Sequence, residues 1–324
     1  MTIRTNTCQL SLYKMESEMA QSVRDTSSLA ATTTRAASLQ TYYTIRLLAD
    51  RDRVADAYRA YAYFRWVDDW IDRAARPRSE QLQFVERQGA LIDALFRGEY
   101  TPDVTPEEQM LVALMQSDPS PSSGLASYIH NMHAVMAFDA ERRGRLISQD
   151  ELNAYSLSLS IAISQGLRYF IGHGRTAPQR AVRHLVTAAY ITHMLRDTRE
   201  DLEAGYFNIS REFLQAHHAS VYEMQSPAFR AWTQGRGELA RRYFRAGREH
   251  LCQVENARFR LACLAYTARF ETVLDMMERD GWLLRPHYRE RKSLPNAVRM
   301  GWSILVSTLA PQLPEEGFRV PVPR

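Results

Sequence analysis

Apolar residues recur at intervals of three and four along the chain from Ala37 onward, whereas strand-like alternation is scarce. This spacing gathers apolar side chains on one face of a helix, so the sequence predicts an all-α fold. Glycine and proline cluster between the apolar segments, where helices are expected to end. The pattern predicts helices over residues 37–48, 51–74, 79–97, 106–116, 124–142, 149–172, 178–203, 210–218, 228–250, 255–280 and 292–309.

The two ends of the chain differ in composition from its middle. Residues 1–36 are polar and rich in Ser, Thr and Ala, which predicts a disordered leader, and Met15 and Met19 are alternative starts within it. The proline-rich residues 311–324 predict an extended tail. Residues 37–310 between them are expected to form a single all-α domain.

Composition excludes several classes of protein. The chain has 324 residues, of which 45% are hydrophobic, and its net charge of +4 gives no reason to expect a nucleic-acid partner. No glycine-rich nucleotide motif of the GxGxxG or GxxxxGK[ST] type occurs. Three widely spaced cysteines favour a reducing, cytoplasmic location over a disulfide framework. No run of 18 apolar residues is present, so no spanning helix is expected. Residues 301–310 are predicted to form a buried final helix, with peripheral membrane contact as the alternative.

Two acidic clusters carry the candidate chemistry. In the first, Asp68 and Asp72 are four residues apart with Asp69 between them, and in the second Asp197 and Asp201 have the same spacing. A helix places such pairs on one face, where like charges repel. A cation would relieve this repulsion, and carboxylate oxygens suit Mg²⁺, which binds a few carboxylates together with substrate phosphates. The sequence therefore predicts two acidic helices that face each other across a Mg²⁺–diphosphate cluster, with Mn²⁺ as a substitute metal.

Around these clusters the chain resembles the squalene/phytoene synthase family, whose members join two prenyl diphosphates head to head. The stretch YAYFRWVDDWID is similar to the family's YAxCRxxDDxxD segment, and MLRDTREDLEAG is similar to its LRDxxEDxxxG segment. The resemblance runs from about Ala37 to Met300. It implies an isoprenoid-synthase-like helical bundle around a central cavity, and a prenyl diphosphate as the substrate.

Particular side chains are assigned roles on this basis. Arg65 lies one helical turn before Asp68, close enough to bind diphosphate oxygens. Arg196 is expected either to contact the ligand or to pair with a neighbouring acid. Tyr61 is expected to line the pocket, to orient a proton in catalysis, or to pack in the core. The metal ligands are expected to be Asp68, Asp69, Asp72, Asp197 and Asp201. The other side chains expected to bind substrate are Thr41, Tyr42, Ile161, Tyr190, His193 and Phe270.

The chain departs from the family pattern near the place where a second prenyl chain would sit. Ile161 and Ser164 stand where small residues are usual, and Phe270 stands where a tyrosine is common. Tyr190 and His193 replace a glutamine and an asparagine. In addition, the family's GRxYLP ending of the second motif reads GYFNIS here, so a basic residue is missing.

Three functions remain open from the sequence. The first is coupling of two prenyl diphosphates to a squalene- or phytoene-type hydrocarbon. The second is a terpene cyclase that acts on a single farnesyl or geranylgeranyl diphosphate with the same acidic helices. The third is a non-catalytic relative, against which the complete acidic motifs argue.

Overall fold

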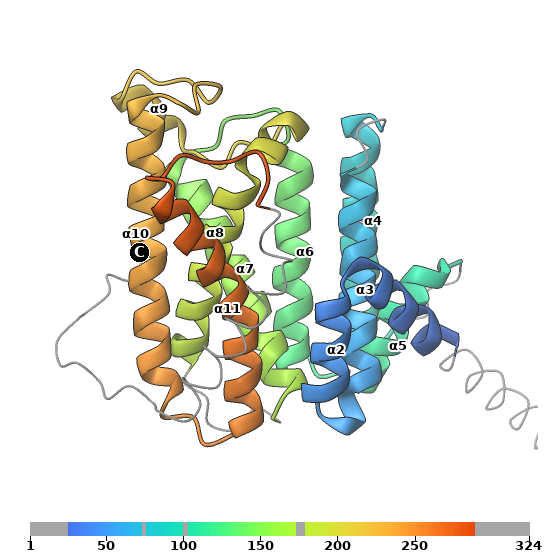
Figure 1. Ribbon diagram of the computed structural model, residues 1–324. Helices are drawn as coiled ribbons and strands as arrows, with labels where there is room; N and C mark the ends of the chain where they lie inside the picture. The colour runs from blue at the N-terminus through green and yellow to red at the C-terminus, as the bar shows by residue number, and fades with distance from the viewer. Residues whose placement is uncertain (1–24, 73–75, 100–102, 173–178, 289–324) are drawn as a thin grey trace, which may run out of the picture. The chain divides into compact units, whose positions relative to one another are not determined.

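The computed structural model describes residues 25–72, 76–99, 103–172 and 179–288. These residues form helices joined by turns and loops, and they contain no strand (Figure 1). The predicted all-α fold is therefore confirmed. The predicted helix over residues 292–309 and the predicted tail over residues 311–324 lie outside the described residues.

The helices begin and end within a few residues of the predicted limits. A 3₁₀ turn, η1 (Arg51–Arg53), forms the start of the helix predicted over residues 51–74. Residues 25–37 are helical as well. The α-helices are α2 (Leu39–Leu48), α3 (Val54–Ile71), α4 (Arg78–Phe96), α5 (Pro106–Ser117), α6 (Gly124–Arg142), α7 (Gln149–Phe170), α8 (Gln179–Ala204), α9 (Arg211–Ala216), α10 (Pro227–Leu251) and α11 (Ala257–Arg279).

Side-chain caps fix several of these limits. The hydroxyl of Ser148 accepts a hydrogen bond from the backbone of Glu151, whose carboxylate accepts one from the backbone of Ser148 in return. This reciprocal pair satisfies two of the amides that a helix start leaves unpaired. Gly205 follows the last residue of α8, just after the second acidic cluster. It has φ 88°, a conformation that glycine adopts without strain, and it ends the helix.

The chain groups into two compact units. Unit 1 comprises Met1–Trp70 and Arg87–Pro121, and unit 2 comprises Ile71–Glu86 and Ser122–Arg324. The boundary passes through α3 and α4, so the first acidic motif has members in both units. The single domain expected over residues 37–310 stays a prediction.

Unit 1 shows that the predicted disordered leader was wrong over residues 25–36. Ala30 and Thr34 in this helical stretch are fully buried, and Ala30 packs with Tyr58, Ala62 and Met110. Small side chains four residues apart allow one helix to approach another closely, so a stretch with a polar composition still buries one face. Residues 1–24 lie outside the described residues.

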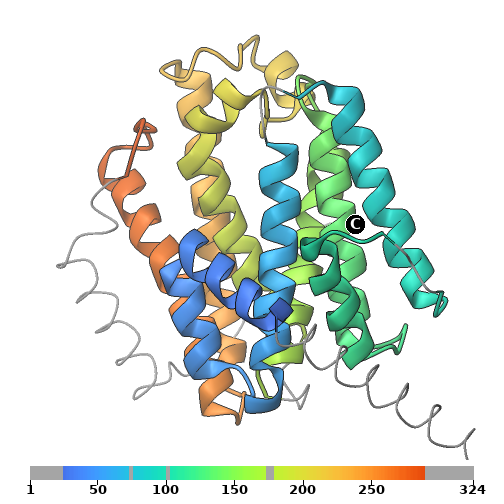
Figure 2. The same ribbon diagram turned by 90° about the vertical axis from the view of Figure 1, so that its right-hand side faces the viewer.

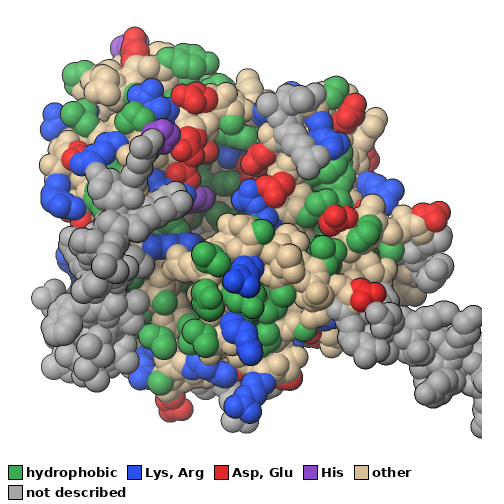
Figure 3. All heavy atoms as spheres, turned by 45° about the vertical axis from the view of Figure 1, so that its right-hand side comes forward, with side chains coloured by type: hydrophobic (Ala, Val, Ile, Leu, Met, Phe, Trp, Pro, Cys, Tyr) green, Lys and Arg blue, Asp and Glu red, His purple; other side chains and the backbone are tan. Residues whose placement is uncertain are grey.

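Unit 2 is built around α8, which packs against α7, α10 and α11, while α7 also packs against α6 (Figures 1 and 2). Gly247 of α10 lies against Leu185 of α8, where a Cβ atom would stand 2.5 Å from a side-chain carbon of Leu185. The missing side chain therefore permits this close approach. Side chains of both charges are spread over the face in Figure 3, as the nearly balanced composition leads one to expect. No described helix is both long enough and apolar enough to cross a membrane.

Candidate active site

Arg65 and two carboxylates of the first motif form an ion-pair cluster on α3. Arg65 Nη1 lies 3.2 Å from Asp68 Oδ2, and Arg65 Nη2 donates a hydrogen bond to Asp69 Oδ1. All three side chains keep a third to a half of their surface exposed. Exposed pairs of this kind contribute little stability, at most about 1 kcal/mol each. The cluster is thus accessible, and it leaves its guanidinium available to a stronger anion.

Asp72 lies just beyond the helix that was expected to carry it. The predicted helix over residues 51–74 ends at Ile71, so Asp72 is the first residue past its end. Its Oδ1 atom accepts a hydrogen bond of 3.1 Å from the hydroxyl of Tyr206. Tyr206 follows the second motif directly after the glycine that ends α8. Within unit 2, this bond connects the end of the first motif to the end of the second.

Asp197 on α8 is held by two basic neighbours. His193 Nε2 lies 2.8 Å from Asp197 Oδ2, and Arg196 Nε donates a hydrogen bond of 2.5 Å to Asp197 Oδ1. Burial opposes ionisation of Asp197, but hydrogen bonds from Arg196 and His193 outweigh it and hold the pKa of this carboxyl below its usual range. In this conformation Arg196 pairs with the neighbouring acid, one of the two roles expected for it.

Asp201 has the opposite electrostatic environment. Its Oδ2 atom accepts a hydrogen bond of 2.7 Å from the side-chain amide of Asn208. Burial, together with the charges of Asp197, Asp139 and Asp72, raises the pKa of Asp201 to about 7. Three other carboxylates of unit 2 therefore act on Asp201, and Arg142 offsets part of their effect.

Arg142 of α6 contacts several residues of this region. Its guanidinium donates hydrogen bonds to Asp139 Oδ1 at 2.6 Å and to Asn208 Oδ1 at 2.9 Å. It also lies 4.9 Å and 5.0 Å from the ring centres of Tyr155 and Tyr206. Tyr155 donates a hydrogen bond to the second oxygen of Asp139. Arg142 thus fixes the two residues, Asn208 and Tyr206, that contact Asp201 and Asp72.

The remaining predicted substrate residues of unit 2 lie on α7, α8 and α11. Tyr190 and Phe270 are buried, with 7% and 4% of their surface exposed. The ring of Phe270 lies 6.0 Å from that of His193, and the ring of Tyr190 lies 5.6 Å from that of Tyr155. Ile161 is partly buried on α7. His193, Asp197 and Phe270 therefore form one group, while a cavity role for Tyr190 and Ile161 stays a prediction.

The predicted substrate residues of unit 1 have local contacts of their own. Thr41 donates a hydrogen bond of 2.9 Å to Ser38, the residue that caps α2. Tyr42 stacks on Tyr58 with ring centres 5.3 Å apart. Tyr61 is partly buried on α3, one turn before Arg65. These contacts account for packing, and a part in substrate binding stays a prediction for each.

Comparison with known proteins identifies the family. A sequence model of the squalene/phytoene synthase family matches residues 34–296, most of the chain. The chain belongs to this family. Members of the family use a divalent metal to ionise a diphosphate.

Individual members of the squalene/phytoene synthase family agree with this assignment. A phytoene synthase from Thermus thermophilus is 30% identical over 145 residues, which cover 43% of this chain and 48% of that protein. The chain thus matches about half the length of this curated relative. The squalene synthase HpnC from Alicyclobacillus acidocaldarius has the same fold, with a TM-score of 0.62 at 20% identity over 81% of this chain and 97% of that one. A dehydrosqualene synthase solved with a ligand gives a TM-score of 0.64 at 16% identity over 90% of this chain and 99% of that one.

The acidic residues have the chemistry of a magnesium site. Their donors are carboxylate oxygens, the ligands that hard divalent cations prefer. Burial raises the pKa of Asp201 most, and the charges of Asp197, Asp139 and Asp72 add to this effect, so a cation beside Asp201 would favour its ionised form. Among the described residues, no three His, Cys, Asp or Glu side chains converge closely enough to hold a metal ion as they stand. Since Asp68 and Asp69 belong to unit 1, their approach to Asp197 and Asp201 stays a prediction.

Sequence reasoning missed Tyr206 and Asn208. Both lie in the segment GYFNIS, which was noted only for the basic residue that it lacks. Their position in the sequence could have identified them, because the chain leaves its helix directly after the second motif and returns toward the acidic side chains. The tyrosine and the asparagine donate hydrogen bonds to the carboxylates of Asp72 and Asp201.

Proposed function

We propose that this protein is a Mg²⁺-dependent prenyltransferase that ionises allylic prenyl diphosphates and couples two of them head to head. The product would be a squalene- or phytoene-type hydrocarbon. Membership of the squalene/phytoene synthase family supports the reaction class. The two acidic motifs, which are complete in this sequence, support the ionisation step.

One observation carries the proposal furthest. The hydrogen bond from Tyr206 to Asp72 joins the end of the first motif to the loop that follows the second. The charge of Asp72 also contributes to the raised pKa of Asp201. Acidic residues 129 positions apart in the sequence, from 72 to 201, therefore act on each other electrostatically. A shared diphosphate-bound cation is the simplest reason for such crowding, since like charges otherwise oppose folding.

The chain's own residues suit the steps of such a reaction. Asp68, Asp69, Asp72, Asp197 and Asp201 would hold Mg²⁺, which neutralises the charge that develops on the departing diphosphate. Arg65 would exchange its exposed carboxylate partners for diphosphate oxygens, since arginine binds phosphate in a bidentate manner.

The carbocation that remains must be kept from water. Phe270 and Tyr190 are buried aromatic side chains close to His193 and Tyr155, and ring faces stabilise positive charge. These side chains would line the part of the site that receives the prenyl chain. Their bulk also favours a second candidate function, a terpene cyclase that accepts only one prenyl diphosphate.

Product analysis separates the two candidates. Purified protein is incubated with Mg²⁺ and with geranyl, farnesyl or geranylgeranyl diphosphate in turn, and the organic extract is analysed by mass spectrometry. Coupling predicts a hydrocarbon with twice the carbon number of its substrate, C30 from farnesyl or C40 from geranylgeranyl diphosphate, and none formed by an Asp197→Asn control. Cyclic products with the carbon number of a single substrate alone, even at high substrate concentration, would replace coupling by cyclisation. The absence of any product from all three would rule out both.

A further inference from the structure

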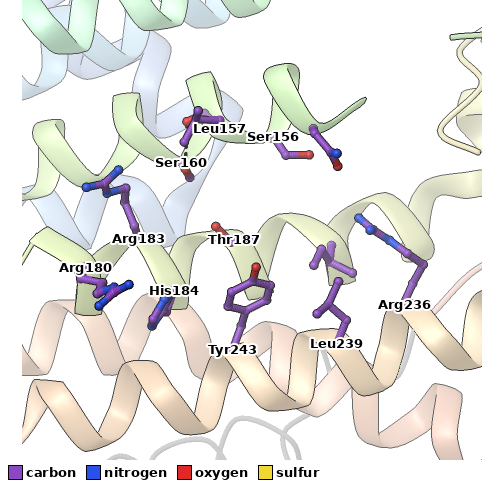
Figure 4. A pocket seen from close by; sticks show the side chains of 12 residues that line it. Ser156, Leu157, Ser160, Arg180, Arg183, His184, Thr187, Arg236, Leu239 and Tyr243 are labelled. Atoms are coloured by element: carbon purple, nitrogen blue, oxygen red, sulfur yellow. Dashed lines mark hydrogen bonds between the residues drawn. The ribbon is translucent and has the colours of Figure 1, made fainter. Parts of the chain in front are cut away.

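Unit 2 contains a cavity that none of the acidic side chains of the candidate site lines. Its volume is about 320 Å³, and it is lined by side chains of α7, α8 and α10. Figure 4 shows Arg180, Arg183 and His184 at one end and Arg236 at the other. Aliphatic side chains of Leu157 and Leu239 also line it. The cavity thus combines cationic ends with partly apolar walls.

The charges in this cavity are unbalanced. Three arginines line it, and none of the described residues that line it is acidic. Arg236 forms no hydrogen bond or ion pair with a described residue, and its Nε atom is shielded from solvent without a partner. Burial lowers the pKa of Arg236, and the ionisable groups that act on it are the tyrosines Tyr190 and Tyr243. A shielded guanidinium without an anion is costly, so a bound anion would be strongly favoured.

The opposite end of the cavity also suits an anion. His184 has a buried Nδ1 atom with no partner. Burial lowers the pKa of His184 to about 4, with His250, Arg180 and Arg183 acting in the same direction, so the ring is neutral at pH 7. A neutral imidazole can donate a hydrogen bond without adding charge. Arg180 and Arg183 stand in the first two turns of α8, where the helix dipole adds to their attraction for an anion.

This cavity and the acidic motif use different faces of α8. Arg183, Thr187 and Ile191 recur at four-residue spacing on the cavity side. His193 and Asp197 recur at the same spacing but are offset from Thr187 by six and ten residues. At about 100° per residue, these offsets place the two rows about a quarter to a third of a turn apart.

We propose that this cavity binds a ligand that carries a phosphate or diphosphate group, held by Arg236 at one end, while Arg180 and Arg183 at the other end add to the attraction for the anion. Arginine is the side chain best suited to phosphate oxygens, and the hydroxyl of Thr187 lines the cavity as an additional donor. The ligand is either a free inorganic anion or a phosphate ester whose carbon chain lies along Leu157 and Leu239. The proposal is independent of the coupling reaction.

Calorimetric titration without metal tests this site. EDTA is added so that the acidic motifs hold no cation, and the protein is titrated with inorganic phosphate, inorganic diphosphate and geranyl diphosphate. We expect saturable binding of at least one probe, weakened at least tenfold in Arg236→Gln. The matched control is Arg245→Gln, which removes the same charge from an exposed position on the same helix and should bind like the wild type. Tighter binding of geranyl than of inorganic diphosphate identifies an ester as the ligand, and equal binding identifies the free anion.

The melting temperature distinguishes a specific loss of binding from misfolding of the variant. Without ligand, Arg236→Gln should melt at the same or a higher temperature than the wild type, because it removes an unpaired shielded charge. The rise in melting temperature that the ligand causes in the wild type should disappear in this variant. If Arg236→Gln does not fold, Arg183→Gln takes its place with the same expectation for binding. Absence of saturable binding to the wild type, or equal weakening in Arg236→Gln and Arg245→Gln, overturns the proposal.

Discussion

At the scale of single residues, the surroundings of Asp201 oppose the negative charge of its carboxylate. Asp197 keeps its charge because Arg196 and His193 hydrogen-bond to it. Asp201 has only the neutral amide of Asn208 as a hydrogen-bond donor among the side-chain contacts described. Burial and three neighbouring carboxylates act on Asp201 and outweigh the opposing charge of Arg142, which raises its pKa to about 7. The pH dependence of stability should reveal this group.

The unfolded chain releases the proton of Asp201 near pH 4, whereas the folded, metal-free protein keeps it until about pH 7. The folded state therefore binds more protons in that window, and its stability falls as the pH rises through it. We expect a loss on the order of 2–4 kcal/mol that is absent in Asp201→Asn. Urea unfolding in EDTA between pH 4 and pH 8 measures it. Glu203→Gln, an exposed position on the same helix, serves as the control and should keep the wild-type loss.

A separate prediction at this scale concerns the effects of replacing Arg65 on stability and on turnover. Its partners Asp68 and Asp69 are exposed, so Arg65→Ala should change stability by less than about 1 kcal/mol. If the guanidinium binds the departing diphosphate, turnover should fall by a factor on the order of 100 or more, because the contact strengthens as charge develops. Steady-state kinetics decides the matter. A raised KM with an unchanged kcat would assign Arg65 to uniform substrate binding instead.

The acidic residues could be predicted from the sequence because their spacing is local. Their partners could not, since Tyr206 and Asn208 reach Asp72 and Asp201 only after the chain leaves α8 and folds back. The helix end at Ile71 was also missed, because the predicted helix continued to residue 74.

At the scale of helices, the close packing of α10 on α8 positions the second acidic motif. Gly247 has no side chain at the point where α10 meets Leu185. In Gly247→Ala the new Cβ would stand 2.5 Å from a side-chain carbon of Leu185 and 3.1 Å from its backbone nitrogen. Because the backbone cannot yield as a flexible side chain can, we expect a loss of about 1–3 kcal/mol in the free energy of unfolding.

Gly235 on the same helix provides the matched control. A Cβ atom there would meet no heavy atom within 4 Å, so Gly235→Ala should gain about 0.5–1 kcal/mol through helix propensity alone. Urea denaturation of both variants gives the comparison. Equal effects of the two substitutions would show that close packing at Gly247 does not matter.

Helix positions were largely predictable because caps and breakers are short-range signals. Ser148 with Glu151, and Thr105 with Glu108, form reciprocal caps where the pattern predicted helix starts. The leader failed as a prediction because its helix, in residues 25–37, is stabilised by tertiary burial of Ala30 and Thr34. Amino-acid composition alone does not reveal tertiary contacts of this kind.

At the scale of the whole molecule, the proposed reaction depends on two acidic motifs that act on one diphosphate. Within unit 2, the charges of Asp72 and Asp197 both raise the pKa of Asp201. Asp68 and Asp69 belong to unit 1, so their share in the same site is a matter for experiment. Removing one charge from each motif is therefore the decisive comparison.

The most direct test is the release of diphosphate from farnesyl or geranylgeranyl diphosphate, measured with and without Mg²⁺. The account predicts release by the wild type with Mg²⁺ and none in EDTA. It also predicts loss of release in both Asp68→Asn and Asp197→Asn, each of which should remain folded by circular dichroism. Release at nearly the wild-type rate by both variants would contradict the claim that the two motifs ionise the substrate together.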